Sequence, residues 1–203
     1  MRRSAFRAFL RLSLPVLLLG ACATPPPPRA PESGPRIELG ALELALEEQA
    51  SALKLDSVAT VRLRQAVESL LRDPSFRHDA EQYTINAVGW FQMGEGGAVV
   101  KFADGRGAVG AEQRPFNLRA WTVGAQIGGS ASRGVLVVIG LEHESNFVGD
   151  YVAEGTRATA VTESTRKPLL LRSKAQGHLV YVVDVSTGLS ADAGVGRVRV
   201  KWR

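Results

Sequence analysis

Two periodicities divide the chain after residue 36. From residue 37 to residue 88 the apolar residues recur every three or four positions, which is typical of amphipathic helices. From residue 89 to residue 203 they alternate with polar residues or form short runs between glycines, which indicates strands. We therefore predict an α+β fold, in which N-terminal helices pack on a mostly antiparallel, glycine-rich β-barrel or β-sandwich.

Two helices account for most of the helical segment. Asp56 or Ser57 is suited to cap the second helix, and Asp73-Pro74 ends it because proline disfavours helical backbone in the preceding residue. The segment from about Ser75 to Ala87 predicts a third short helix, although Tyr83 to Asn86 equally fits the start of a strand. The apolar faces are Leu39, Leu42, Leu46 and Leu53, interrupted by Gln49, in the first helix, and Ala59, Leu63, Ala66, Val67, Leu70 and Leu71 in the second.

Glycines divide the rest of the chain into strands. Residues 89–140 hold 12 of the 21 glycines, and glycine permits tight turns and close backbone approach. Asp104-Gly105 predicts a hairpin turn, and the continuous apolar run from Gly134 to Leu141 predicts a central strand. Further strands are expected before Gly128, at 156–162, 169–171 and 179–185, and at the C-terminus, while Phe147 to Glu154 is expected to be a break or a short helix. The total is seven to nine strands with no intervening helical pattern.

The last strand has the clearest alternation in the chain. Val198, Val200 and Trp202 share one face, and four cations, Arg197, Arg199, Lys201 and Arg203, share the other. Such a row could attract anionic lipid headgroups, with about 1 kcal/mol for each cation near the surface. The alternative is an edge strand that its charges protect against pairing with a second chain.

The first 36 residues indicate secretion and a lipid anchor. Residues 1–21 combine an arginine-rich start with an apolar run of ten residues, which is too short to span a bilayer and fits a signal peptide. Leu19-Gly20-Ala21-Cys22 resembles the lipobox of bacterial lipoproteins, so we predict that Cys22 is acylated after cleavage. An ordinary cleaved signal is the alternative. Residues 22–36 hold six prolines and predict an extended tether, and Ala23 implies sorting to the outer membrane of a Gram-negative cell, with the domain in the periplasm.

Charge and motifs exclude several functions. Without residues 1–21 the chain has 21 basic and 20 acidic residues, which gives no case for nucleic acid binding. Enzyme signatures are nearly absent, since the three histidines are scattered and no nucleophile elbow or phosphate loop is present. Glu142, His143 and Glu144 fit a solvated loop better than a metal site. We expect no catalytic residues, no metal and no cofactor.

A family resemblance rests on glycine-centred motifs from about Val61 to Trp202. The motifs are Asp73-Pro74 at the end of a helix, Gly89-Trp90-Phe91, the segment from Gly94 to Val100, the block from Val123 to Ser130 leading into Val135–Val138, and Gly188-Leu189-Ser190-Ala191 before the last strand. Their order resembles the SYLF (DUF500) domain in its bacterial lipoprotein form. The resemblance implies non-catalytic binding of acidic phospholipids. A family of periplasmic barrels that maintain envelope integrity has a similar glycine-rich layout and is the rival.

The function predicted from these observations is that of a membrane-anchored lipoprotein. The SYLF-like domain, residues 37–203, would bind phospholipid non-catalytically through Arg197, Arg199, Lys201 and Arg203. The interior of a small barrel offers a second route, if its own side chains leave room for an acyl chain. The alternative function is structural, with an envelope protein or the peptidoglycan as partner.

Overall fold

The computed structural model describes residues 36–96, 100–123, 131–154, 168–185 and 195–203. Within these residues three α-helices precede eight strands, and one 3-10 helix, Glu144–Phe147, lies between strands. The helices are α1 (Leu39–Ser51), α2 (Ser57–Arg72) and α3 (Pro74–Gln82). The strands are β1 (Ile85–Gly96), β2 (Val100–Val109), β3 (Arg114–Val123), β4 (Ala131–Ile139), β5 (Gly149–Glu154), β6 (Leu169–Ser173), β7 (Leu179–Asp184) and β8 (Val195–Trp202).

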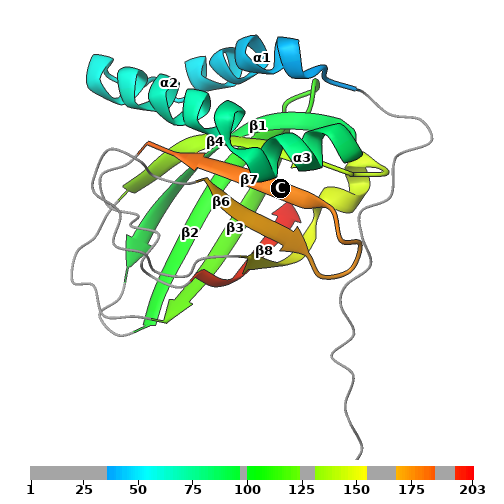
Figure 1. Ribbon diagram of the computed structural model, residues 1–203. Coiled ribbons are helices and arrows are strands. Elements are labelled where there is room, and N and C mark those ends of the chain that lie inside the picture. The colour runs from blue at the N-terminus through cyan, green and yellow to red at the C-terminus, as the bar shows by residue number, and fades with distance from the viewer. Residues whose placement is uncertain (1–35, 97–99, 124–130, 155–167, 186–194) are drawn as a thin grey trace, which may run out of the picture.

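The eight strands form one closed barrel with the order β1-β2-β3-β8-β5-β6-β7-β4, and each neighbouring pair is antiparallel (Figure 1). The predicted α+β fold is confirmed, and the sheet is a barrel and not a sandwich. Because β8 pairs with β3 on one side and β5 on the other, it is not an edge strand. The charges on β8 therefore have no unpaired edge to protect.

Two aspartates define the helix boundaries. The Asp56 carboxylate accepts a hydrogen bond from Ala59 N at 2.8 Å and caps α2. Asp73 ends α2 and then caps α3, where its carboxylate accepts from Ser75 N and Phe76 N and Pro74 occupies the first turn. Of the two alternatives for residues 83–86 the strand is confirmed, since α3 ends at Gln82 and β1 begins at Ile85. The helical segment therefore ends before the predicted boundary at residue 88.

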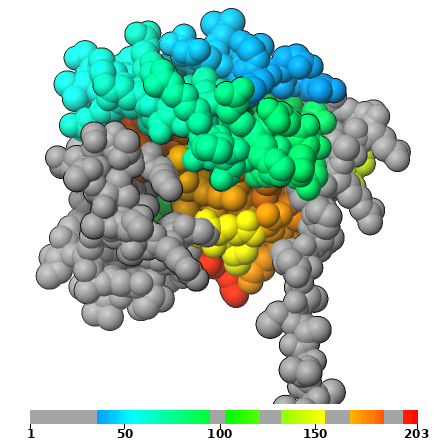
Figure 2. Space-filling model, in the orientation of Figure 1, coloured from blue at the N-terminus to red at the C-terminus, as the bar shows by residue number. Residues whose placement is uncertain are grey.

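The three helices cover one side of the barrel (Figures 1 and 2). Their apolar faces pack on the outward side chains of β1, β4 and β7, and the edge of the Phe76 ring meets Tyr181 with 5.0 Å between ring centroids. The buried outward residues are Ile85, Val88, Val135, Val137, Ile139, Leu179, Tyr181 and Val183. Residues 134–139 of β4 are buried with both faces covered, which accounts for their continuously apolar sequence and confirms the predicted central strand.

Inward side chains of the same strands fill the barrel and form a second apolar cluster. The described connections β2–β3, β4–β5 and β6–β7 all lie at one end of the barrel, where Phe147 contacts the rings of Phe116, Tyr151 and Trp202. We call this the aromatic end. The Arg114 guanidinium lies 4.0 Å from the centre of the Trp202 ring. This end of the interior is filled by the protein's own side chains.

The predicted hairpin at Asp104-Gly105 is wrong, because β2 runs through both residues. Asp104 pairs across the sheet with Arg119 of β3, while Gly105 faces Met93, whose Cγ would lie 2.6 Å from an added Cβ. Residue 105 is therefore a glycine because the side chain of Met93 leaves no room for a Cβ inside the barrel. The turn to β3 comes at residues 110–113, where Gly110 has a φ of +82° and Gln113 a φ of +50°.

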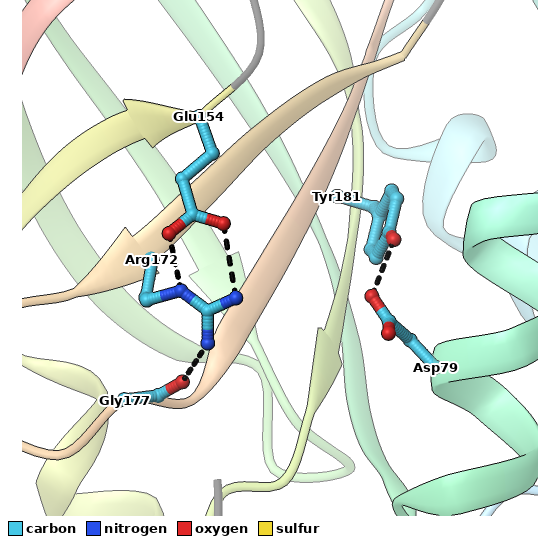
Figure 3. Close-up of polar contacts among 5 residues, drawn as sticks. All are labelled: Asp79, Glu154, Arg172, Gly177 and Tyr181. Carbon is cyan, nitrogen blue, oxygen red and sulfur yellow. Dashed lines mark hydrogen bonds and ion pairs between the residues drawn. The ribbon is translucent and has the colours of Figure 1, made fainter. Parts of the chain in front are cut away.

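Polar contacts connect the helices to the barrel (Figure 3). The Tyr181 hydroxyl donates to Asp79 of α3 at 2.7 Å, and the Gln113 amide donates to the buried Gln49 of α1 at 2.9 Å. Between β6 and β5 the Arg172 guanidinium makes a bidentate pair with Glu154.

Other predicted features lie outside the described residues. They are the strand at 156–162, the turn at 128–130, the motif at 188–191 and everything before residue 36.

Candidate functional site

The predicted alternation of β8 is confirmed. Val198 and Val200 are buried in the barrel interior, while Arg197, Arg199 and Lys201 are exposed on the outer face. Arg203 follows the strand and is also exposed, and its backbone N–H donates to Pro115 O at 3.2 Å. The structure thus places three of the predicted cations on the outer face of one strand and the fourth directly after its end. Cys22 lies outside the described residues.

The neighbouring strands extend this row into a surface. Lys201 pairs across the sheet with Asn117 of β3, which pairs with Arg106 of β2, and Arg199 pairs with Arg119 of β3. Arg106 and Arg119 are on the same outer side of the sheet. We call the six cations together the basic face: Arg106, Arg119, Arg197, Arg199, Lys201 and Arg203.

A row of four charges crosses the middle of the basic face. Its members are Asp104 of β2, Arg119 of β3, Arg199 of β8 and Asp150 of β5, in the order of the strands. Arg119 Nε lies 2.6 Å from Asp104, and Arg199 makes a bidentate pair with Asp150 at 2.6 and 3.0 Å. Two arginines directly opposite each other repel. The two carboxylates stand at the two ends of the row, each beside one arginine, and their negative charges offset that repulsion.

The hydrogen bonds within this row shift the titration of its members. The hydrogen bond from Arg199 lowers the pKa of the Asp150 carboxyl, and the charges of Arg197 and Lys174 add to this effect. The hydrogen bond to Asp104 raises the pKa of Arg119. The positive charges of Arg119 and Arg199 are therefore largely neutralised by their partners.

The other four cations have no carboxylate partner among the described residues. The Arg106 guanidinium donates two hydrogen bonds to the side-chain oxygen of Gln92, at 2.7 and 2.8 Å, and these do not cancel its charge. Arg197, Lys201 and Arg203 form no ion pair within the described part of the chain. The basic face thus carries six cations against two carboxylates, with the surplus on Arg106, Arg197, Lys201 and Arg203.

Sequence reasoning found the β8 residues but missed Arg106 and Arg119. Both alternate with inward residues in their own strands, Arg119 lying between Leu118 and Ala120. This alternation predicts which side of the sheet each side chain faces. It does not give the register, and only the register brings these two arginines beside β8.

Buried polar groups at the aromatic end form a structural cluster. The Tyr151 hydroxyl donates to Phe147 O and lies 2.8 Å from His178 Nε2, so the histidine donates through Nε2. His178 Nδ1 is buried without a partner among the described residues, and burial lowers the pKa of His178 to about 4. Because each residue is only 1% exposed, Tyr151 and His178 are out of reach of a substrate.

The described residues offer no other polar site with a clear chemistry. No group of three or more potential metal-ligating side chains occurs among them. The loop residues Glu142 and His143 are part of no such group, and one Glu144 carboxylate oxygen is buried without a hydrogen bond to the described part of the chain. Nor does any described helix have the length and apolar character needed to cross a membrane.

A groove of about 280 Å³ lies between α1 and α2. Leu46, Leu63 and Val67 line it with apolar side chains, and Arg64 of α2 reaches Glu47 of α1 at 3.2 Å. Large exposed apolar residues are also on these helices, namely Leu44, Val58 and Val61. The helical layer therefore has an amphipathic surface of its own.

Comparison with known proteins adds little to this geometry. No protein-family model matches the chain, and no curated protein matches it either. Among solved structures, the chain is similar to a beta-barrel-like, uncharacterized protein from Brucella abortus, at 18% identity and a TM-score of 0.42, over 64% of this chain and 80% of that one. A likeness of this size supports no inference about function.

Proposed function

We propose that this chain is a lipoprotein of a bacterial outer membrane whose periplasmic domain binds anionic phospholipid without catalysis, through the basic face. In this proposal residues 1–21 are removed, Cys22 carries the lipid, and residues 22–36 tether the domain to the membrane. Membrane association then has two sources, the acyl chains and the protein surface. Two such signals together anchor far more stably than one.

The surplus of positive charge on one exposed face carries the proposal. Residues 22–203 have nearly balanced charge, so a face with six cations and two carboxylates is a local concentration of charge. Each lysine or arginine near an anionic surface contributes about 1 kcal/mol. Four cations without carboxylate partners in the described chain would therefore contribute about 4 kcal/mol, and added salt would weaken this attraction.

The glycine motifs support the same function, because they resemble those of SYLF domains, which bind acidic phospholipids. The barrel is consistent with such a domain. The filled aromatic end favours binding at the outer face over an acyl chain entering from that end, since Phe116, Phe147 and Tyr151 occupy it.

A second candidate function is a structural or protein-interaction role in the envelope. The groove between α1 and α2, with Leu44, Val58 and Val61 exposed on the same helices, favours it. The two functions are separable by experiment, because the groove and the basic face lie on different elements. A protein partner would be sensitive to changes on α1 and α2 and insensitive to changes on β8.

Flotation of residues 22–203, with Cys22 replaced by serine, on lipid vesicles tests the phospholipid proposal. We expect flotation with phosphatidylglycerol vesicles, little with phosphatidylcholine vesicles, and a loss of at least about ten-fold for the double variant Arg197→Glu/Lys201→Glu. The matched control is Arg62→Glu/Arg77→Glu, which changes the net charge equally on exposed positions of α2 and α3. Equal loss in both double variants, or no flotation of the parent protein, would contradict the proposal.

Lipidation has its own test. The chain has one cysteine, so replacing Cys22 by serine should abolish metabolic labelling with palmitate and release the protein from the membrane fraction at high salt. Labelling that persists in the serine variant would show that acylation occurs elsewhere.

A further inference from the structure

The helical layer and the basic face occupy opposite sides of the barrel. In the strand order β4 has β1 and β7 as neighbours, and the helices pack on these three strands. Counting four strands from β4 in either direction leads to β8. The strand that carries most of the basic face is therefore diametrically opposite the strand at the centre of the helical layer.

The two sides also differ in the sign of their charge. Residues 36–83, which form the helical layer, hold more acidic than basic residues. The basic face has the opposite imbalance. A protein with separated charge of this kind turns in the field of an anionic surface until its positive side faces that surface.

The basic face is extended in two directions. From Arg197 to Arg203 it follows β8 for about 20 Å, given about 3.3 Å per residue, and from β2 to β8 it spans two strand spacings, about 10 Å. The neutralised row of Asp104, Arg119, Arg199 and Asp150 crosses it. The remaining cations lie on both sides of this row, with Arg197 on one and Lys201, Arg203 and Arg106 on the other.

We infer that the barrel lies on its side against an anionic bilayer, with β2, β3 and β8 in contact with the headgroups and α1–α3 facing away. This inference rests on the proposed function and specifies the surface that the ligand occupies. Cations distributed over two dimensions suit many headgroups of a bilayer better than one small anion, which would need converging groups in a pocket. The same orientation leaves the groove between α1 and α2 open to the aqueous side.

Site-specific labelling tests the orientation, because the Cys22→Ser chain contains no cysteine and accepts single new ones. Asn117→Cys places a fluorophore on β3 within the basic face, at an exposed position between Arg106 and Lys201. Val61→Cys places it on α2, where the native side chain is 54% exposed. Both labels should be open to an aqueous quencher in solution. On phosphatidylglycerol vesicles we expect quenching to fall at least about three-fold at residue 117 and to stay unchanged at residue 61.

The failures can be told apart. The orientation is wrong, while phospholipid binding stands, if the labelled proteins float with vesicles and the label at residue 61 is protected. The same conclusion follows if they float and neither label is protected. If they do not float, the proposed function itself fails. Protection of residue 117 by soluble polyphosphate but not by vesicles would also overturn the inference, in favour of a linear polyanion as ligand.

Discussion

The outer face of β1, β4 and β7 and the outer face of β2, β3 and β8 belong to the same closed sheet but have opposite chemistry. The first carries valine, leucine, isoleucine and tyrosine beneath the helices, and the second carries arginine, lysine and aspartate in contact with water. The inward positions of both are mainly apolar, with buried Ser132 of β4 as a polar exception. The fold therefore depends on the inward face everywhere and on the outward face only beneath the helices, which leaves the rest of the barrel surface available for binding.

The largest expected loss of stability follows from a substitution on the helix-covered face. Leu70 of α2 is fully buried against the barrel, so Leu70→Ala should lower the free energy of unfolding by about 2–5 kcal/mol, since it leaves a cavity. Asn117→Ala, on the basic face, should change it by less than about 0.5 kcal/mol. Urea denaturation followed by circular dichroism measures both. Similar losses in the two variants would contradict the division between a structural and a free face.

The interior shared by both faces should show a pH dependence. Burial lowers the pKa of His178 from 6.5 to about 4, so between these two values the unfolded chain binds a proton that the folded barrel excludes. The contribution of neutral His178 to the free energy of unfolding should therefore be fully present above pH 6.5 and decrease as the pH drops towards 4. The total loss should be about 3 kcal/mol, because each pH unit between the two pKa values removes about 1.4 kcal/mol. Denaturation of the native protein across this range measures the slope.

Removal of the titrating group is the control for this slope. His178→Phe keeps an aromatic ring beside Tyr151, and His178→Gln keeps a side chain able to donate to the Tyr151 hydroxyl. In either variant that folds, the loss of stability between pH 6.5 and pH 4 should shrink markedly. An unchanged slope would assign the pH dependence to other groups.

A contact between the helical layer and the barrel should have a smaller effect. Tyr181→Phe removes the hydroxyl that donates to Asp79 and keeps the ring that packs against Phe76. We expect a loss of about 1 kcal/mol in unfolding free energy, the usual net value for one hydrogen bond. Asp79→Asn leaves an acceptor for the same hydroxyl and should cost less. A greater cost for Asp79→Asn would indicate that the carboxylate has another role.

The sequence predicted the helices and most strands, but the break or short helix expected from Phe147 to Glu154 is wrong, because β5 occupies Gly149–Glu154. Buried stripes such as Leu63, Val67 and Leu70, and the alternation in β8, depend on local periodicity and were predicted correctly. Asp104-Gly105 was wrongly predicted as a turn because the same dipeptide also suits a strand whose glycine faces a crowded interior. Local propensity does not distinguish these two cases, since the decisive contact, with Met93, comes from the neighbouring strand.

The candidate site was predicted only as far as one strand. The four cations of β8 follow from alternation, but the addition of Arg106 and Arg119, and the pairing of Arg199 with Asp150, depend on which strands are neighbours. The strand order places β8 between β3 and β5, far from its sequence neighbour β7. Such an order is a property of the closed barrel and has no local signal in the chain.

The smallest expected change in stability accompanies an informative change in binding. Asp150→Asn removes the carboxylate that neutralises Arg199, and because the pair is partly exposed, the unfolding free energy should change by less than about 1 kcal/mol. The basic face would then carry one negative charge fewer beside Arg199. Binding to phosphatidylglycerol vesicles should strengthen by up to about five-fold, the equivalent of about 1 kcal/mol per cation.

Glu112→Gln is the matched control for Asp150→Asn, since it removes one negative charge in the turn between β2 and β3, away from the row of ion pairs. Acid cannot replace the substitution near neutral pH, because Arg199 lowers the pKa of Asp150 and keeps it ionised. If both variants strengthen binding equally, the effect comes from net charge. If only Asp150→Asn does so, the Asp150 carboxylate limits the attraction of the basic face, and the arrangement of its charges, rather than their number, determines how strongly it holds a membrane.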